Sequence, residues 1–121
     1  MAIKAFKDLD VYKLAHELAN EIFQLTKECP REEKYSLIDQ IRRSSRSVAV
    51  NVAEGWGKRR YASVFKRHLT DSNGSLEETK SWLQFALDCD YISNEIHDYF
   101  VKRYEKLGAK LWNLHDNWRT F

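Results

Sequence analysis

The stretch that decides the fold is QIRRSSRSVAVNVAEGWGKRR, residues 40–60. Its apolar and small residues recur every three or four positions, which is the period of an amphipathic α-helix. This apolar stripe consists of Ile38, Ile41, Ser45, Val48 and Val52. The pattern predicts a helix that begins near Ser36, with Ser36 as N-cap and Asp39 three residues later. Gly55 and Gly57 are expected to end the helix, with Gly55 as its C-cap.

Three further segments show the same helical period. They run from about Leu9 to Cys29, from about Ser63 to Tyr91, and from Ser93 toward the end of the chain. Asp8 or Asp10 is expected to cap the first of these helices. Because the connections between the four segments are short, successive helices should be antiparallel neighbours.

The predicted fold is an all-α, up-down-up-down antiparallel four-helix bundle that forms a single domain over residues 1–121. The scarcity of helix breakers supports this fold, because the chain has only four glycines and one proline. Ten stripe residues are predicted to fill the core: Leu18, Ile22, Ile41, Val48, Leu69, Leu76, Leu83, Leu107, Leu111 and Leu114. No apolar run approaches the roughly 20 residues that a membrane span needs. The absence of a secretory signal pattern and the two isolated cysteines predict a cytoplasmic protein.

The positive charge of the chain is concentrated in one region. Residues 42–67 contain eight Lys or Arg and one acid, which gives +7, whereas residues 1–41 carry −2 and residues 68–121 carry −3. Such a concentration is typical of a surface that meets an anionic partner, although a solvated basic helix would show the same pattern. The candidate nucleic-acid-binding residues are Arg42, Arg43, Arg46, Trp56, Lys58, Arg59, Arg60, Lys66 and Arg67. Trp56 is included because an exposed indole can stack on an unpaired base.

Several large apolar residues lie off the stripes. Val50 lies among polar residues, and Phe85 points away from the stripe of its helix. Trp82 lies to one side of its stripe, and Trp112 lies more than a right angle from its own. Outward-facing residues of this kind usually mark a partner surface, and the simplest partner is a second copy of the chain. We therefore predict an oligomer interface that contains Val50, Trp82, Phe85 and Trp112. Wide packing faces within one monomer are the alternative.

The sequence offers no catalytic or metal-binding pattern. None of the four histidines has a glutamate three residues before it, as a di-iron bundle would require. The glycines at 55 and 57 follow a helix and not a strand, so they do not form a dinucleotide-binding turn. His68 adjoins Lys66 and Arg67 and is expected to join the basic surface. We predict no enzymatic activity, no metal and no cofactor.

At three places the sequence resembles a known family. Gln40–Gly55, Asn73–Thr79 and Phe6–Tyr12 are similar to the signatures of small proteins encoded in intervening sequences of bacterial 23S ribosomal RNA genes. This resemblance implies a four-helix bundle, a homopentamer and no enzymatic activity. A similar bundle serves diversity-generating retroelements as a basic pentameric accessory protein. In this chain, Gly74 is expected to mark the close approach of a neighbouring helix, and Asn51 and Glu54 to form hydrogen bonds across the bundle or between subunits.

Two functions from different classes are compatible with the sequence. The first is a non-enzymatic oligomer that binds nucleic acid, with structured RNA or a ribonucleoprotein favoured because of the arginines and Trp56. The second is an oligomeric scaffold whose basic region meets an acidic protein, which the outward-facing aromatic residues favour. Neither function involves a membrane.

Overall fold

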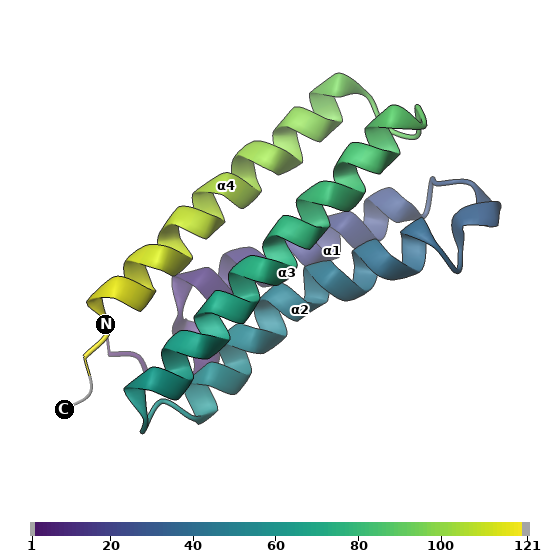
Figure 1. The fold of residues 1–121 in the computed structure, drawn as a ribbon. Helices are drawn as coiled ribbons and strands as arrows, with labels where there is room; N and C mark the ends of the chain where they lie inside the picture. Colours follow the sequence, from purple (N-terminus) through teal and green to yellow (C-terminus); the bar gives the residue numbers. More distant parts are fainter. Residues whose placement is uncertain (1, 120–121) are drawn as a thin grey trace.

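A computed structural model describes residues 2–119 of the chain. It consists of four α-helices and two short 3₁₀ turns: η1 (Phe6–Asp8), α1 (Asp10–Thr26), η2 (Arg31–Glu33), α2 (Leu37–Gly57), α3 (Ala62–Asp88) and α4 (Asn94–Asn117). The helices run alternately up and down along one bundle (Figure 1). Residues 2–119 contain no strand, and the predicted all-α four-helix bundle is confirmed.

The core lies where the four apolar stripes meet. Nine of the ten predicted core residues are buried, and Leu114, near the end of α4, is half-buried. Beyond these ten residues the core contains aromatic side chains, among them Phe65 and Phe100, which also lie on the apolar stripes, and Tyr104. Tyr104 is fully buried, and the loss of solvent raises the pKa of its hydroxyl above the ordinary tyrosine value.

The helix ends differ in part from the predicted caps. Ser36 does precede α2, but its hydroxyl donates to the carboxylate of Glu33 and does not cap the helix. Asp8 accepts hydrogen bonds from two backbone N–H groups of the turn before it and therefore stabilises η1, while Leu9 precedes α1. Ser93 caps α4 as a serine should, because its Oγ accepts the Ile96 N–H at 3.2 Å.

Gly55 is not a C-cap, contrary to the prediction. It lies buried inside α2, where a Cβ atom would stand 2.8 Å from His68 Cβ and 3.1 Å from Phe65 Cδ1. The missing side chain therefore lets α3 approach α2 closely. Gly74 behaves in the opposite way, since a Cβ atom at position 74 would meet nothing within 4 Å. We expected a neighbouring helix to pack against Gly74, but no helix within residues 2–119 does so.

A seam of polar hydrogen bonds joins α2 to α3. Thr79 donates to Ser44 at 2.9 Å, Ser72 donates to the Val48 carbonyl at 2.7 Å, and the hydroxyls of Ser47 and Ser75 lie 2.9 Å apart. Small side chains at the seam allow the two helices to pack closely, and directional hydrogen bonds fix their register. Of the four pairs of adjacent helices, α2 and α3 make the most extensive contact, and α1 and α4 make the sparsest.

Within residues 2–119, the four helices are each too short or too polar to cross a bilayer.

Candidate nucleic-acid interface

The predicted basic residues occupy three separate places on the bundle. Arg42 and Arg46 lie on the side of α2 that faces α1, and Arg43 lies on the side of α2 that borders α3. The remaining cations lie at or beside the turn between α2 and α3, namely Lys58, Arg59, Arg60, Lys66 and Arg67. The predicted cations therefore lie on two sides of α2 and at the turn that follows it, and do not form one continuous surface.

The first place is a cluster around the ring of Phe23 on α1, which we call the Phe23 cluster (Phe23, Lys27, Arg42 and Arg46). The guanidinium carbons of Arg42 and Arg46 lie 4.5 and 5.5 Å from the ring centroid, and Lys27 Nζ lies 4.9 Å from it. Arg42 Nε also donates to Thr26 Oγ1 at 2.8 Å. The ring thus gathers three cations from α2 and the end of α1, and such a concentration of positive charge could bind a phosphate group.

Sequence reasoning missed two members of the Phe23 cluster. Lys27 lies one helical turn beyond Phe23, a spacing that brings the ammonium group over the ring. Phe23 itself lies off the main stripe of α1, on the side that faces α2. An aromatic residue followed by lysine at i+4 is the signal that could have identified the pair.

The second place is the turn after α2, where Arg59 covers Trp56. The guanidinium carbon of Arg59 lies 3.9 Å from the Trp56 ring centroid, and its Nη1 donates to the Trp56 carbonyl at 2.9 Å. Trp118 meets Trp56 edge-on at 6.3 Å between centroids. Trp56 is therefore half-buried between an arginine and another indole and is not the free stacking surface that the sequence suggested. The planar guanidinium of Arg59, which is exposed, covers the outer face of the Trp56 ring.

Lys58 is held by a buried histidine. Its Nζ lies 3.3 Å from His68 Nε2, and His68 Nδ1 lies 3.3 Å from Asn51 Oδ1. Because an ammonium group can only donate, Nε2 must accept and the ring proton must reside on Nδ1, which then donates to Asn51. His68 is buried and its two ring nitrogens face Lys58 and Asn51, so it does not join the exposed basic surface as predicted. Asn51, in contrast, does form the expected hydrogen bond across the bundle.

None of the eight Lys and Arg residues between 42 and 67 forms an ion pair within residues 2–119. The carboxylates that pair with a Lys or Arg do so elsewhere, and Glu77, for example, lies 3.6 Å from Lys80. Glu54 is exposed and pairs with none of the described arginines. Neither Glu54 nor Glu77 therefore neutralises these arginines within residues 2–119, and the cations are available to an anion from outside.

The predicted oligomer residues fall on two faces. Val50 and Phe85 are 51% and 52% exposed, and the Trp82 ring packs against Phe85 at 5.6 Å. The Ser47–Ser75 hydrogen bond and the helical spacing place Val50, Trp82 and Phe85 along the outer side of the α2–α3 seam. Trp112 is exposed on α4 beside His115. The role of all four residues in association stays a prediction.

Residues 2–119 bring no three His, Cys, Asp or Glu side chains together in a way that could hold a metal ion.

Comparison with known proteins identifies the family. Residues 7–113 match the model of the 23S rRNA-intervening sequence protein family. A crystal structure of a protein of unknown function from the S23 ribosomal protein family of Bacteroides thetaiotaomicron has the same fold, with a TM-score of 0.80. The two sequences are 23% identical, and the alignment covers 88% of this chain and 96% of the other. No curated protein sequence matches the chain. The match over most of its length shows that this chain belongs to the 23S rRNA-intervening sequence protein family.

Proposed function

We propose that this protein is a cytoplasmic, non-enzymatic oligomer that binds nucleic acid, preferentially structured RNA or a ribonucleoprotein. One observation carries the proposal: eight Lys and Arg residues lie between positions 42 and 67, and none of them has a carboxylate partner within residues 2–119. Unpaired cations on a chain with net charge of only +2 favour a localised anionic partner.

The spacing of the cations indicates an extended partner. Arg42 of the Phe23 cluster and Lys58 at the turn are sixteen residues apart, which corresponds to about 24 Å along α2. In a duplex, where phosphates follow one another at about 3.4 Å per strand along the axis, this distance spans several phosphates. A folded RNA could therefore contact the Phe23 cluster and the turn together. The half-buried position of Trp56 makes backbone contacts more important than base stacking in this proposal.

We expect Arg59→Ala with Arg60→Ala to weaken RNA binding about equally for all sequences and to make the affinity less dependent on salt. Each phosphate that is neutralised releases counterions, so removing two cations lowers the slope of log K against log salt concentration by about 0.7–0.9 for each phosphate that is no longer neutralised. Filter binding to a structured RNA at several salt concentrations measures both effects. Arg31→Ala with Lys34→Ala is the matched control, because these exposed residues lie in and beside η2, at the opposite end of the bundle. A wild-type protein that binds neither RNA nor DNA at low salt would rule out the nucleic-acid function and leave the scaffold.

The scaffold alternative rests on the exposed apolar residues along the α2–α3 seam. An apolar surface of this kind, with Val50 and Phe85 half-exposed, favours a protein partner. In our proposal the partner is another copy of the chain, and assembly would multiply the number of cations that one RNA can meet. The homopentamer that the sequence resemblance implies stays a prediction.

We expect Phe85→Lys to dissociate this oligomer, because a lysine in an apolar interface must either be desolvated or hold the subunits apart. Light scattering of the purified protein at several concentrations measures the mass. Tyr35→Lys provides the control, since Tyr35 is 83% exposed in the loop before α2, away from the seam. Should the wild-type protein be monomeric at high micromolar concentration, the assembly along the α2–α3 seam does not exist.

A further inference from the structure

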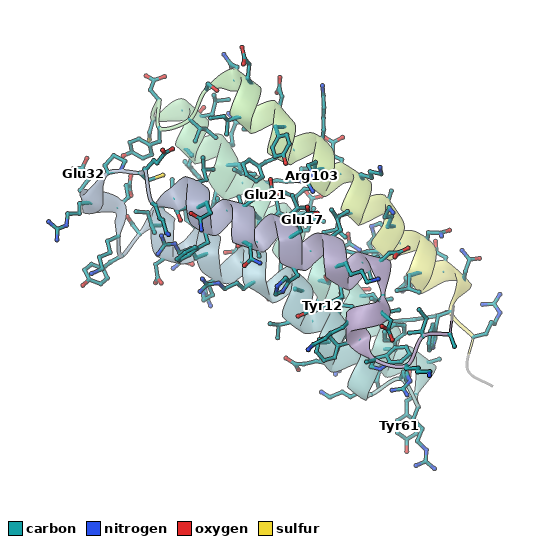
Figure 2. The ribbon with its side chains drawn as sticks, turned by 180° about the vertical axis from the view of Figure 1, so that it is seen from behind. Tyr12, Glu17, Glu21, Glu32, Tyr61 and Arg103 are labelled. Carbon is teal, nitrogen blue, oxygen red and sulfur yellow. The ribbon has the colours of Figure 1, made fainter. Side chains whose placement is uncertain are left out.

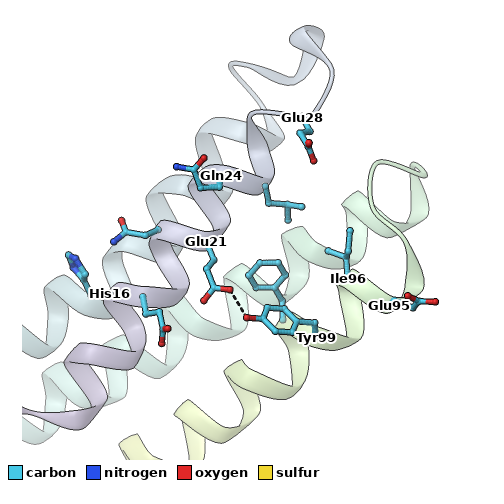
Figure 3. Close-up of a pocket in the computed structure, with 11 residues that line it drawn as sticks. His16, Glu21, Gln24, Glu28, Glu95, Ile96 and Tyr99 are labelled. Carbon is cyan, nitrogen blue, oxygen red and sulfur yellow. Dashed lines mark hydrogen bonds between the residues drawn. The ribbon is translucent and has the colours of Figure 1, made fainter.

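A groove lies between α1 and α4, on the side away from the α2–α3 seam (Figure 3). This α1–α4 groove has a volume of about 1070 Å³ in its first half, which extends toward the end of α1 and the start of α4. Four carboxylates line this half: Glu17, Glu21, Glu28 and Glu95. Apolar surface accompanies them, since Ile96 and Tyr99 are 38% and 46% exposed. The first half of the groove is therefore acidic, with an apolar strip.

The second half of the same groove carries the opposite charge. It has a volume of about 680 Å³ and continues between the same two helices in the other direction. Its cations are Lys13, Arg103, Lys106 and Lys110, and its acids are Asp10 and Glu17. None of the three lysines forms an ion pair within residues 2–119, and neither do Glu28 and Glu95 in the acidic half. The unpaired charge is therefore negative in the first half and mainly positive in the second, where Asp10 also has no ion-pair partner within residues 2–119.

A network of hydrogen bonds marks the boundary between the two halves. Arg103 of α4 pairs with Glu17 of α1 at 2.9 Å and also with Glu21, and Tyr99 donates to Glu21 (Figure 2 and Figure 3). The hydrogen bond to Glu21 raises the pKa of the Tyr99 hydroxyl, because it stabilises the protonated form that donates. This network holds α1 and α4 at a fixed separation, and the charges on either side of it remain unpaired.

The charges of α4 are arranged almost symmetrically about this network. Along α4, Glu95 lies eight residues before Arg103 and Lys110 lies seven residues after it, which corresponds to about 12 and 10 Å. A two-fold rotation about an axis near Arg103 would therefore bring Glu95 of one copy opposite Lys110 of the other. The same rotation would bring Tyr99 opposite the aliphatic part of Lys106. A two-fold contact requires one patch that is complementary to itself, and a groove with an acidic and a basic half meets this condition.

We propose that the α1–α4 groove is a docking surface for a second copy of this chain, which lies antiparallel across it with the acidic half of each groove against the basic half of the other. The Arg103 network would lie at the centre of this contact, and Ile96 and Tyr99 on one side of it would be covered by the aliphatic parts of the facing lysines. This contact is separate from the predicted association along the α2–α3 seam, which lies on the other side of the bundle. It is also independent of nucleic-acid binding.

Charge reversal in each half of the groove tests the proposal. The background is the full chain with Phe85→Lys, in which only the groove contact should remain, and sedimentation equilibrium should show a dimer. Glu28→Lys with Glu95→Lys, and separately Lys106→Glu with Lys110→Glu, should each raise the dimer dissociation constant at least tenfold. An equimolar mixture of the two double variants should dimerise again, and native mass spectrometry should show a heterodimer, because each altered groove now complements only the other. Higher salt should weaken this heterodimer.

The control is Glu105→Lys with Asp116→Lys, which makes the same change of charge at exposed positions of α4 outside the groove lining. This variant should dimerise as well as the Phe85→Lys chain, and circular dichroism should show that every variant is folded. A monomeric Phe85→Lys chain at several hundred micromolar would overturn the proposal and assign the groove to a different partner. Double variants that dimerise normally when alone, or that stay monomeric when mixed, would also overturn it. An absence of RNA binding or of association along the α2–α3 seam would leave these expectations unchanged.

Discussion

Replacing Leu76 with alanine is expected to lower the free energy of unfolding by about 2–5 kcal/mol. Leu76 lies in the middle of α3, is 1% exposed, and packs toward Gly108 of α4, where a Cβ atom would stand 3.7 Å from Leu76 Cδ1. The neighbouring helix cannot collapse into the space of the three missing carbons, so the cost includes a cavity as well as reduced apolar burial. Urea or thermal unfolding followed by circular dichroism measures the change.

The comparison variant for this prediction is Leu87→Ala. Leu87 is on the same helix but is half-buried and packs at the edge of the core. Its truncation should cost clearly less than that of Leu76, because part of the side chain is already in water. Equal effects at the two positions would show that the centre of α3 is not packed as the structure has it.

The second large effect is expected at Gly55, where alanine should destabilise the fold by about 1–3 kcal/mol. The new Cβ would lie 2.8 Å from His68 Cβ, and this contact involves no flexible end that could move aside. Gly74→Ala is the matched control, and it should change the free energy of unfolding in the opposite direction. A Cβ atom there meets nothing within 4 Å, so the better helix propensity of alanine should stabilise the monomer by about 0.5–1 kcal/mol.

The two glycine variants can be compared in one chemical unfolding experiment. The prediction at Gly55 fails if its alanine variant is as stable as the wild type. At Gly74, a stabilised chain that no longer associates would show that another copy approaches this glycine. A glycine in the middle of an exposed helix face is otherwise unfavourable, and nothing in the described chain accounts for it.

The sequence predicted the bundle because each helix carries one continuous apolar stripe. Residues such as Leu18 and Leu83 recur at helical spacing, and periodicity alone is sufficient to place them inside. Helix ends were predicted less well, because they depend on the partner that a side chain finds. The hydroxyl of Ser36 donates to Glu33 and does not cap α2. The hydrogen bonds that Glu33 accepts from Ser36 and Tyr91 lower the pKa of its carboxyl.

The candidate site was predicted by charge but not by shape. Periodicity assigns a direction to each side chain of α2, and it already implies that Arg42 and Arg43 point to different sides, about 100° apart. It does not reveal which residue of another helix lies opposite, so the Phe23 cluster was missed. For the same reason His68 and Trp56 were placed on the surface, whereas contacts with Asn51 and with Trp118 draw them inward. Contacts between distant parts of a chain are the information that a single sequence does not contain.

The sparse contact between α1 and α4 has a consequence for how the bundle assembles and opens. Helices α1 and α2, α2 and α3, and α3 and α4 are each neighbours in the sequence, so their contacts form with little loss of chain entropy and favour rapid folding. Only α1 and α4 bring together segments from opposite ends of the chain. They should dock last and separate first, so amide hydrogens on these two helices should exchange with solvent before those of α2 and α3. The bundle would then open along a single longitudinal line, while the α2–α3 hairpin persists as its most durable unit.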